Sequence, residues 1–122
     1  MADSMKIRID VGEKTLKATL VNTPAARDFL TLLPLTVALE DYAKTEKICD
    51  LPRKLSTQGA PAGYEPRAGD ITYYAPWGNL AIFYRGFSYS SGLVHLGTIE
   101  GDLEALIAAG NTQVNIQRDD TP

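Results

Sequence analysis

The chain has 122 residues, with 12 Lys and Arg against 15 Asp and Glu, and 44% of its residues are apolar. This length suits one domain with a real core, so we expect a single domain over residues 1–122 with flexible tails at 1–4 and 119–122. The net charge of −3 disfavours nucleic-acid and membrane-surface partners, which usually select a clustered basic face.

Residues 1–21 predict a β-hairpin. Apolar and polar side chains alternate over residues 6–11, which is the period of a half-buried strand. Gly12-Glu13 suits a two-residue turn with glycine at its first central position. This turn pairs residues whose numbers sum to 25, so that the apolar side chains of both strands share one face. The expected pairs are Met5 with Leu20, Ile7 with Ala18 and Ile9 with Leu16.

A helix and two strands are predicted next. Thr23 and Pro24 are typical of the capping position and the first position of a helix. Apolar side chains then recur at helical spacing, at Ala26, Phe29, Leu30 and Leu33. Pro34 ends this pattern, because the residue before a proline is disfavoured in the helical region. Residues 35–40 alternate as a strand, and residues 45–50 indicate a weaker one.

The middle of the chain predicts a long loop and a second hairpin. Residues 56–70 hold three Gly and two Pro and almost nothing apolar, a composition typical of a long irregular loop. Residues 71–75 and 80–85 are predicted strands on either side of turn-forming residues at 76–79.

The last segment completes a barrel. Residues 86–92 predict a loop and residues 93–99 a strand. Asp102 can cap a short helix that Gly110 ends, and residues 112–118 alternate as a final strand. The helix residues expected to face inward are Leu103, Leu106 and Ile107. Eight short strands and two short helices favour a mainly β fold, a closed eight-stranded antiparallel barrel, because closure removes the exposed strand edges.

Three stretches of the second half carry a family resemblance: PRAGDITYY at 66–74, PWGNLAIFY at 76–84 and GLVHLGTI at 92–99. Together with the order of the elements, they resemble the cyclophilin-like barrel family of small bacterial and archaeal proteins. The resemblance covers most of residues 5–118. It implies the cyclophilin fold, an eight-stranded barrel closed by two helices, in a family most of whose members have no assigned activity.

The sequence departs from the prolyl isomerases of that fold. Those enzymes carry a Phe-His-Arg stretch, a following Phe and a Gln-Gly-Gly-Asp motif, and this sequence has no Gln-Gly-Gly-Asp. Phe83-Tyr84-Arg85 resembles the first triplet only superficially. The isomerases' His-Val-Val-Phe-Gly pattern matches residues 93–97, which places their histidine position at Leu93 and not at His95. The resemblance therefore implies the fold without the isomerase motif.

Few side chains suggest catalysis. His95 is the only histidine, and a structural role is favoured because a lone imidazole needs an oriented partner. Cys49 is the only cysteine, which excludes an internal disulfide and a zinc site of several thiolates; a buried, idle thiol is favoured. Asp70 is explained by turn capping. We expect no catalytic residue, no metal site and no cofactor.

Aromatic residues are unevenly placed. Eight of the ten lie between residues 64 and 89, and alternation lets only half of those in the hairpin point into the barrel, without deciding between Phe83 and Tyr84. Exposed aromatics beside an arginine make a plausible groove for an apolar ligand or a peptide. The predicted ligand-binding residues are Tyr74, Trp77, Phe83, Arg85, Phe87, Tyr89 and His95. The alternative is packing beneath the 56–70 loop or at a dimer interface.

These observations favour a non-catalytic domain that binds a small molecule or a peptide segment in an aromatic groove. One alternative is a divergent prolyl isomerase, the expected activity if the protein is an enzyme. Another is a structural interaction module, for example a homodimer. The sequence shows no apolar run long enough for a membrane span and no signal peptide, so we expect a cytoplasmic protein without membrane or nucleic-acid partners.

Overall fold

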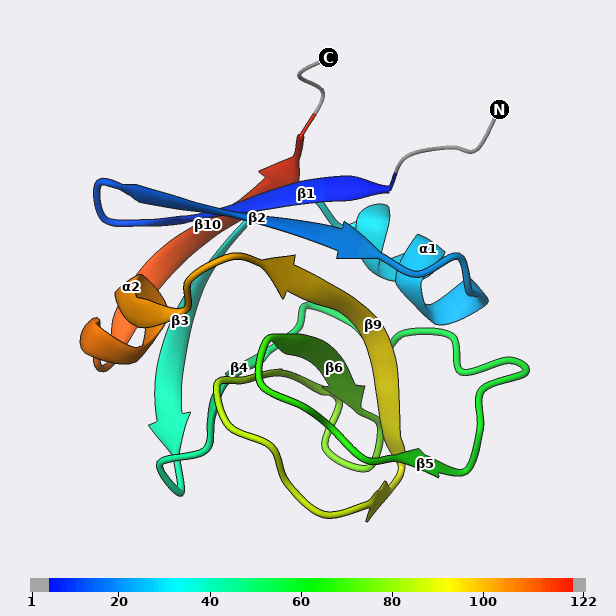
Figure 1. The fold of residues 1–122 in the computed structure, drawn as a ribbon. Coiled ribbons are helices and arrows are strands. Elements are labelled where there is room, and N and C mark those ends of the chain that lie inside the picture. The colour runs from blue at the N-terminus through cyan, green and yellow to red at the C-terminus, as the bar shows by residue number, and fades with distance from the viewer. Residues whose placement is uncertain (1–4, 120–122) are drawn as a thin grey trace.

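A computed structural model describes residues 5–119, and Figure 1 shows its fold. The strands are β1 (Lys6–Val11), β2 (Lys14–Leu20), β3 (Leu35–Tyr42), β4 (Glu46–Asp50), β5 (Gly63–Tyr64), β6 (Asp70–Tyr74), β7 (Asn79–Phe83), β8 (Ser90–Ser91), β9 (Leu93–Glu100) and β10 (Thr112–Arg118). The helices are α1 (Pro24–Leu30) and α2 (Glu104–Ala108). Eight antiparallel strands close into a barrel in the order β1-β10-β3-β4-β7-β6-β9-β2. The predicted closed barrel with two helices is confirmed.

Two short strands lie outside the barrel. β5 and β8 pair with each other as a small separate sheet, with Gly63 opposite Ser91 and Tyr64 opposite Ser90. Both lie in segments predicted as loops, at 56–70 and 86–92. Two-residue strands leave no alternating pattern in the sequence, which is why the prediction missed them.

The first hairpin has the predicted register. Ile7 pairs with Ala18 and Ile9 with Leu16, and Gly12 takes the positive φ of +62° that the turn requires. β1 also pairs with β10, whose other neighbour is β3. The backbone N–H of Asp119 donates to the Lys6 carbonyl at 3.0 Å. The remaining residues of the expected tails, 1–4 and 120–122, lie outside the described residues.

Both helices pack apolar side chains on the core, from different sides of the barrel in Figure 1. The Thr23 hydroxyl accepts the N–H of Ala26 at 3.2 Å and begins α1 as predicted. α2 begins one residue later than an Asp102 cap implies, with Leu103 at the capping position. Asp102 instead accepts the N–H of Glu104 at 2.9 Å. The expectation for Ile107 is wrong: it is exposed, because a five-residue helix buries one narrow face and Leu106 fills it.

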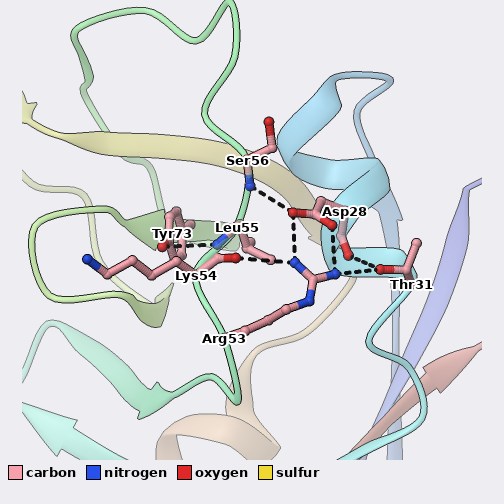
Figure 2. A network of polar contacts seen from close by, with 7 residues as sticks. All are labelled: Asp28, Thr31, Arg53, Lys54, Leu55, Ser56 and Tyr73. Atoms are coloured by element: carbon pink, nitrogen blue, oxygen red, sulfur yellow. Dashed lines mark hydrogen bonds and ion pairs between the residues drawn. The ribbon is translucent and has the colours of Figure 1, made fainter.

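A polar network ties the segment after β4 to α1, as Figure 2 shows. Arg53 donates two hydrogen bonds to the Asp28 carboxylate, at 2.7 and 3.0 Å, and a third to the Thr31 hydroxyl. The backbone N–H of Ser56 donates to the same carboxylate at 2.7 Å. These hydrogen bonds, that of Arg53 first, lower the pKa of Asp28. The start of the long loop predicted from residue 56 is therefore held against α1 by hydrogen bonds.

The sheet formed by β4, β7, β6 and β9 has two differently packed faces. Inside the barrel lie Tyr73, Leu80 and Ile82, which belong to the main core. Outside it, a second cluster forms from Ala81, Phe83 and Leu93, with Ile48, Tyr64 and Tyr74 packed against it. Phe83 therefore points outward, and Tyr73 is the buried inward aromatic of the hairpin. The outer cluster is the floor of the candidate site.

Candidate functional site

The outer cluster opens into a pocket of about 280 Å³, near the lower limit of typical ligand pockets. Its floor is the outer face of the barrel, and its walls come from the end of β3, the β6–β7 turn and the segment before β8. The lining residues are Tyr42, Ala43, Thr45, Glu46, Ile48, Tyr74, Trp77, Asn79, Ala81, Phe83, Phe87, Ser90 and Leu93. The pocket thus joins side chains of segments between residues 42 and 93.

On one side of the pocket, the ring of Trp77 meets two tyrosine rings at nearly right angles. Trp77 lies 5.3 Å from Tyr74 and 6.1 Å from Tyr42, measured between ring centroids, with interplanar angles of 83° and 84°. The tight turn that carries Trp77 depends on Gly78, which has a φ of +68° and donates its N–H to the Tyr74 carbonyl. Trp77 remains 59% exposed. We call Tyr42, Tyr74 and Trp77 the aromatic cage.

Two polar side chains in the pocket have no partner among the residues that the structure describes. The Glu46 carboxylate takes part in no hydrogen bond or ion pair among residues 5–119. Burial raises the pKa of Glu46 to about 7. Asn79 is only 5% exposed, and its buried side-chain oxygen accepts no hydrogen bond from the described residues. A buried oxygen such as that of Asn79 is costly to leave unpaired.

Glu46 enters the pocket because β4 turns its alternate residues outward. It pairs with Tyr42 of β3 on one side and with Phe83 of β7 on the other. The next residue, Lys47, points into the barrel, where it is 1% exposed. Its Nζ donates to the Gly110 carbonyl at 2.7 Å and lies 3.4 Å from the Asp41 carboxylate.

Four of the seven predicted ligand-binding residues line this pocket: Tyr74, Trp77, Phe83 and Phe87. The other three do not. Arg85 is exposed and does not line it. Tyr89 is also exposed, and its ring lies against Gly63, where an added Cβ would come within 2.6 Å of the ring. His95 lies in a separate cluster.

His95 belongs to a polar cluster centred on Asp70. Its ring stacks on Tyr64 at 4.7 Å, and its Nε2 lies 3.4 Å from an Asp70 oxygen. The buried Asp70 carboxylate accepts the Tyr64 hydroxyl at 2.6 Å and the Arg67 N–H at 2.8 Å. The pKa of Tyr64 is raised to about 12, mainly by burial and next by the hydrogen bond between its hydroxyl and Asp70. The cluster fixes the β5 segment to the barrel, and Asp70 does more than cap a turn.

Cys49 lies on the inner face of β4. Its side chain is buried, and burial is the main cause that raises the pKa of the thiol to about 12. Within the described residues, no cluster of His, Cys, Asp and Glu could hold a metal ion. The same part of the chain contains no helix long and apolar enough to cross a membrane.

Sequence reasoning missed several pocket residues: Tyr42, Glu46, Ile48, Asn79 and Leu93. Their common signal is alternation on the outer face of the sheet, and it becomes readable only once the β4–β7 register is known. Leu93, matched above with the isomerase histidine position, is buried in the pocket floor.

A family model described as the cyclophilin-like family matches residues 9–117. The chain belongs to this cyclophilin-like family. Its fold is similar to that of the hypothetical protein AF2241 from Archaeoglobus fulgidus, with a TM-score of 0.67 and 18% sequence identity over 95% of both chains. It is also similar to McbB, solved in complex with tryptophan, with a TM-score of 0.62 and 14% identity. That match covers 95% of this chain but 45% of McbB. No curated protein matches the sequence.

The family match confirms the resemblance drawn from the three sequence stretches. At 18% and 14% identity, the two solved structures support the fold alone. The function of this cyclophilin-like chain therefore has to be argued from its own pocket.

Proposed function

We propose that this cyclophilin-like protein is a non-catalytic binding domain whose aromatic pocket takes a small molecule or a short peptide segment. The observation that carries the proposal is the position of Trp77, exposed at the pocket mouth between Tyr42 and Tyr74 above an apolar floor. Exposed aromatic side chains gathered around one hollow are typical of a binding site rather than of a solvated surface.

Binding is favoured over turnover by the side chains that line the pocket. Among the described residues, those that line the pocket include a single carboxyl group, Glu46, and no His, Cys, Lys or Arg. General acid–base chemistry usually requires a second oriented group, and nucleophilic catalysis requires an activated nucleophile. His95, the remaining candidate, is stacked on Tyr64 outside the pocket. Arg85, which a divergent isomerase would need against the twisted amide, also lies outside it.

The class of ligand to test first is a small molecule that carries an aromatic or apolar group. McbB, which shares the fold, was solved in complex with tryptophan. The small pocket volume and the apolar floor suit a ligand of similar size. A net charge of −3 disfavours nucleic acid as a partner. We also propose that the domain is cytoplasmic.

Trp77 is the only tryptophan, so its fluorescence reports on the pocket directly. We expect acrylamide to quench it, and a true ligand from a panel of metabolites and peptides to change its emission and raise the melting temperature. Trp77→Ala should abolish the ligand-induced rise in melting temperature while lowering the stability by less than the ~3–5 kcal/mol of a buried aromatic. Tyr89→Ala is the matched control, because Tyr89 is 57% exposed but lies outside the pocket.

The alternatives predict other results. An unquenchable Trp77 and a panel without any hit would refute the binding function. Acceleration of prolyl cis–trans exchange that is lost in Arg85→Ala would instead indicate an isomerase. Elution as a dimer that protects Trp77 from acrylamide would identify the pocket as an interface between copies.

A further inference from the structure

The polar groups of the pocket have one electrostatic character. Glu46 supplies its only formal charge, and that charge is negative. The pocket also holds one buried polar atom with no partner among the described residues, the side-chain oxygen of Asn79, which is an acceptor. An occupant that satisfies both must bring positive charge or hydrogen-bond donors.

The aromatic cage adds a third source of negative potential. The face of an aromatic ring is electron-rich, and Trp attracts cations best, followed by Tyr and Phe. Trp77 stands edge-to-face with both Tyr74 and Tyr42, so its ring plane is nearly perpendicular to each of theirs. Rings at such angles can surround a compact cation on several sides, as in the cages that recognise quaternary ammonium groups.

Among residues 5–119, no cation neutralises Glu46. Burial is the cause of its raised pKa. Lys47, next in the chain, points into the barrel towards Gly110 and Asp41. The charge of Lys44, in the preceding turn, helps to lower the pKa of Asp41. The charge of Arg85, after β7, acts to lower the pKa of the Tyr84 phenol, against the larger effects that raise it.

We propose that the occupant of this pocket is a small organic ammonium ion, held by cation–π contacts with the aromatic cage and by the Glu46 carboxylate. The inference rests on the proposed binding function and narrows its ligand class. An anion would meet Glu46 with no compensating side chain. A neutral apolar molecule would fit the floor but would leave the oxygens of Glu46 and Asn79 unpaired, which disfavours it.

Choline and 3,3-dimethylbutan-1-ol are the probes, because they share shape and differ in charge. We expect choline to bind at least about tenfold more tightly than the neutral alcohol, measured by calorimetry or by Trp77 emission. A cation favours the ionised carboxylate, so choline affinity should rise as the pH increases through about 7, the pKa of Glu46. Binding at neutral pH should also release protons.

Two variants and two controls assign the effect to named groups. Glu46→Gln should weaken choline binding about tenfold and remove its pH dependence. Glu40→Gln removes the same charge from the same side of the sheet but outside the pocket. It should leave the choline affinity and its pH dependence unchanged. Trp77→Leu should weaken the binding of choline more than the binding of the alcohol, whereas Tyr89→Leu should change neither affinity.

The outcomes separate this inference from the proposed function. Equal affinities for choline and the alcohol, or choline binding that is unchanged in Glu46→Gln, would overturn the cation inference and leave a binding pocket. If neither probe nor any member of the metabolite and peptide panel binds, the binding function fails together with it.

Discussion

Replacing Glu46 with glutamine should stabilise the unliganded protein above about pH 7. The folded state raises the pKa of this carboxyl from 4.5 to about 7 by burying it, so the folded protein holds the proton more tightly than the unfolded chain does. Stability linked to Glu46 is therefore highest below about pH 4.5, falls as the pH rises towards 7, and is lost above it. Glutamine is neutral throughout and removes this loss.

The size of the effect follows from the same shift. A pKa difference between 4.5 and about 7 corresponds to about 3 kcal/mol of the free energy of unfolding when solvent screening is ignored. Glu46 is only partly buried, and water at the pocket mouth screens its charge. We therefore expect a difference of about 1–2 kcal/mol between the glutamine variant and the parent at alkaline pH.

Urea denaturation at about pH 5 and about pH 8.5 measures this difference. Comparing parent and variant at each pH removes the contributions of Asp28 and Glu100, whose pKa values are lowered and which act in the opposite direction. Glu40→Gln serves as the control for losing one exposed charge. A Glu46→Gln advantage that is the same at both pH values, or absent at pH 8.5, would refute the conclusion that Glu46 is a partly buried carboxyl without a compensating cation.

Three further predictions concern the barrel. Tyr73→Phe removes the hydroxyl that accepts the buried N–H of Leu55 at 3.1 Å, so urea denaturation should show a loss of about 1–3 kcal/mol; no loss would mean that water replaces the hydroxyl. Gly97→Ala would place a Cβ 2.5 Å from the Thr19 carbonyl oxygen. We therefore expect a lower melting temperature and a loss of stability of about 1–3 kcal/mol. An unchanged melting temperature would mean that the two strands move apart without cost. Truncation after Asn111 removes β10 from between β1 and β3 and should cause aggregation through the two exposed edges; a soluble, cooperatively melting product would argue against closure.

The parts of the fold that the sequence predicts are those in which two local signals agree. In the first hairpin, the alternation over residues 6–11 and the turn at Gly12 independently give one register. Thr23 and Pro24 mark the start of α1 in the same way. The β5–β8 sheet has neither signal, because it depends on Tyr64 and Tyr89 meeting residues far along the chain.

The pocket was predictable only in part, because its walls come from distant segments. The cluster of aromatics in the second half of the sequence indicated Trp77 and its neighbours. Tyr42, however, reaches Trp77 from the end of β3, and only the order β3-β4-β7-β6 brings the two together. The sequence leaves the direction of Phe83 open, and the β4–β7 pairing decides it.

The character of the pocket depends on how β4 distributes two adjacent charges. Because strand side chains alternate, Glu46 and Lys47 must lie on opposite faces. An apolar core would be expected to exclude the lysine, yet Lys47 points inward, where the Gly110 carbonyl and Asp41 hold its ammonium group. Glu46 is thereby directed outward beside Tyr42 and Phe83, and no other described residue supplies it with a cation. The protein satisfies its buried positive charge internally and leaves the negative one available to a ligand.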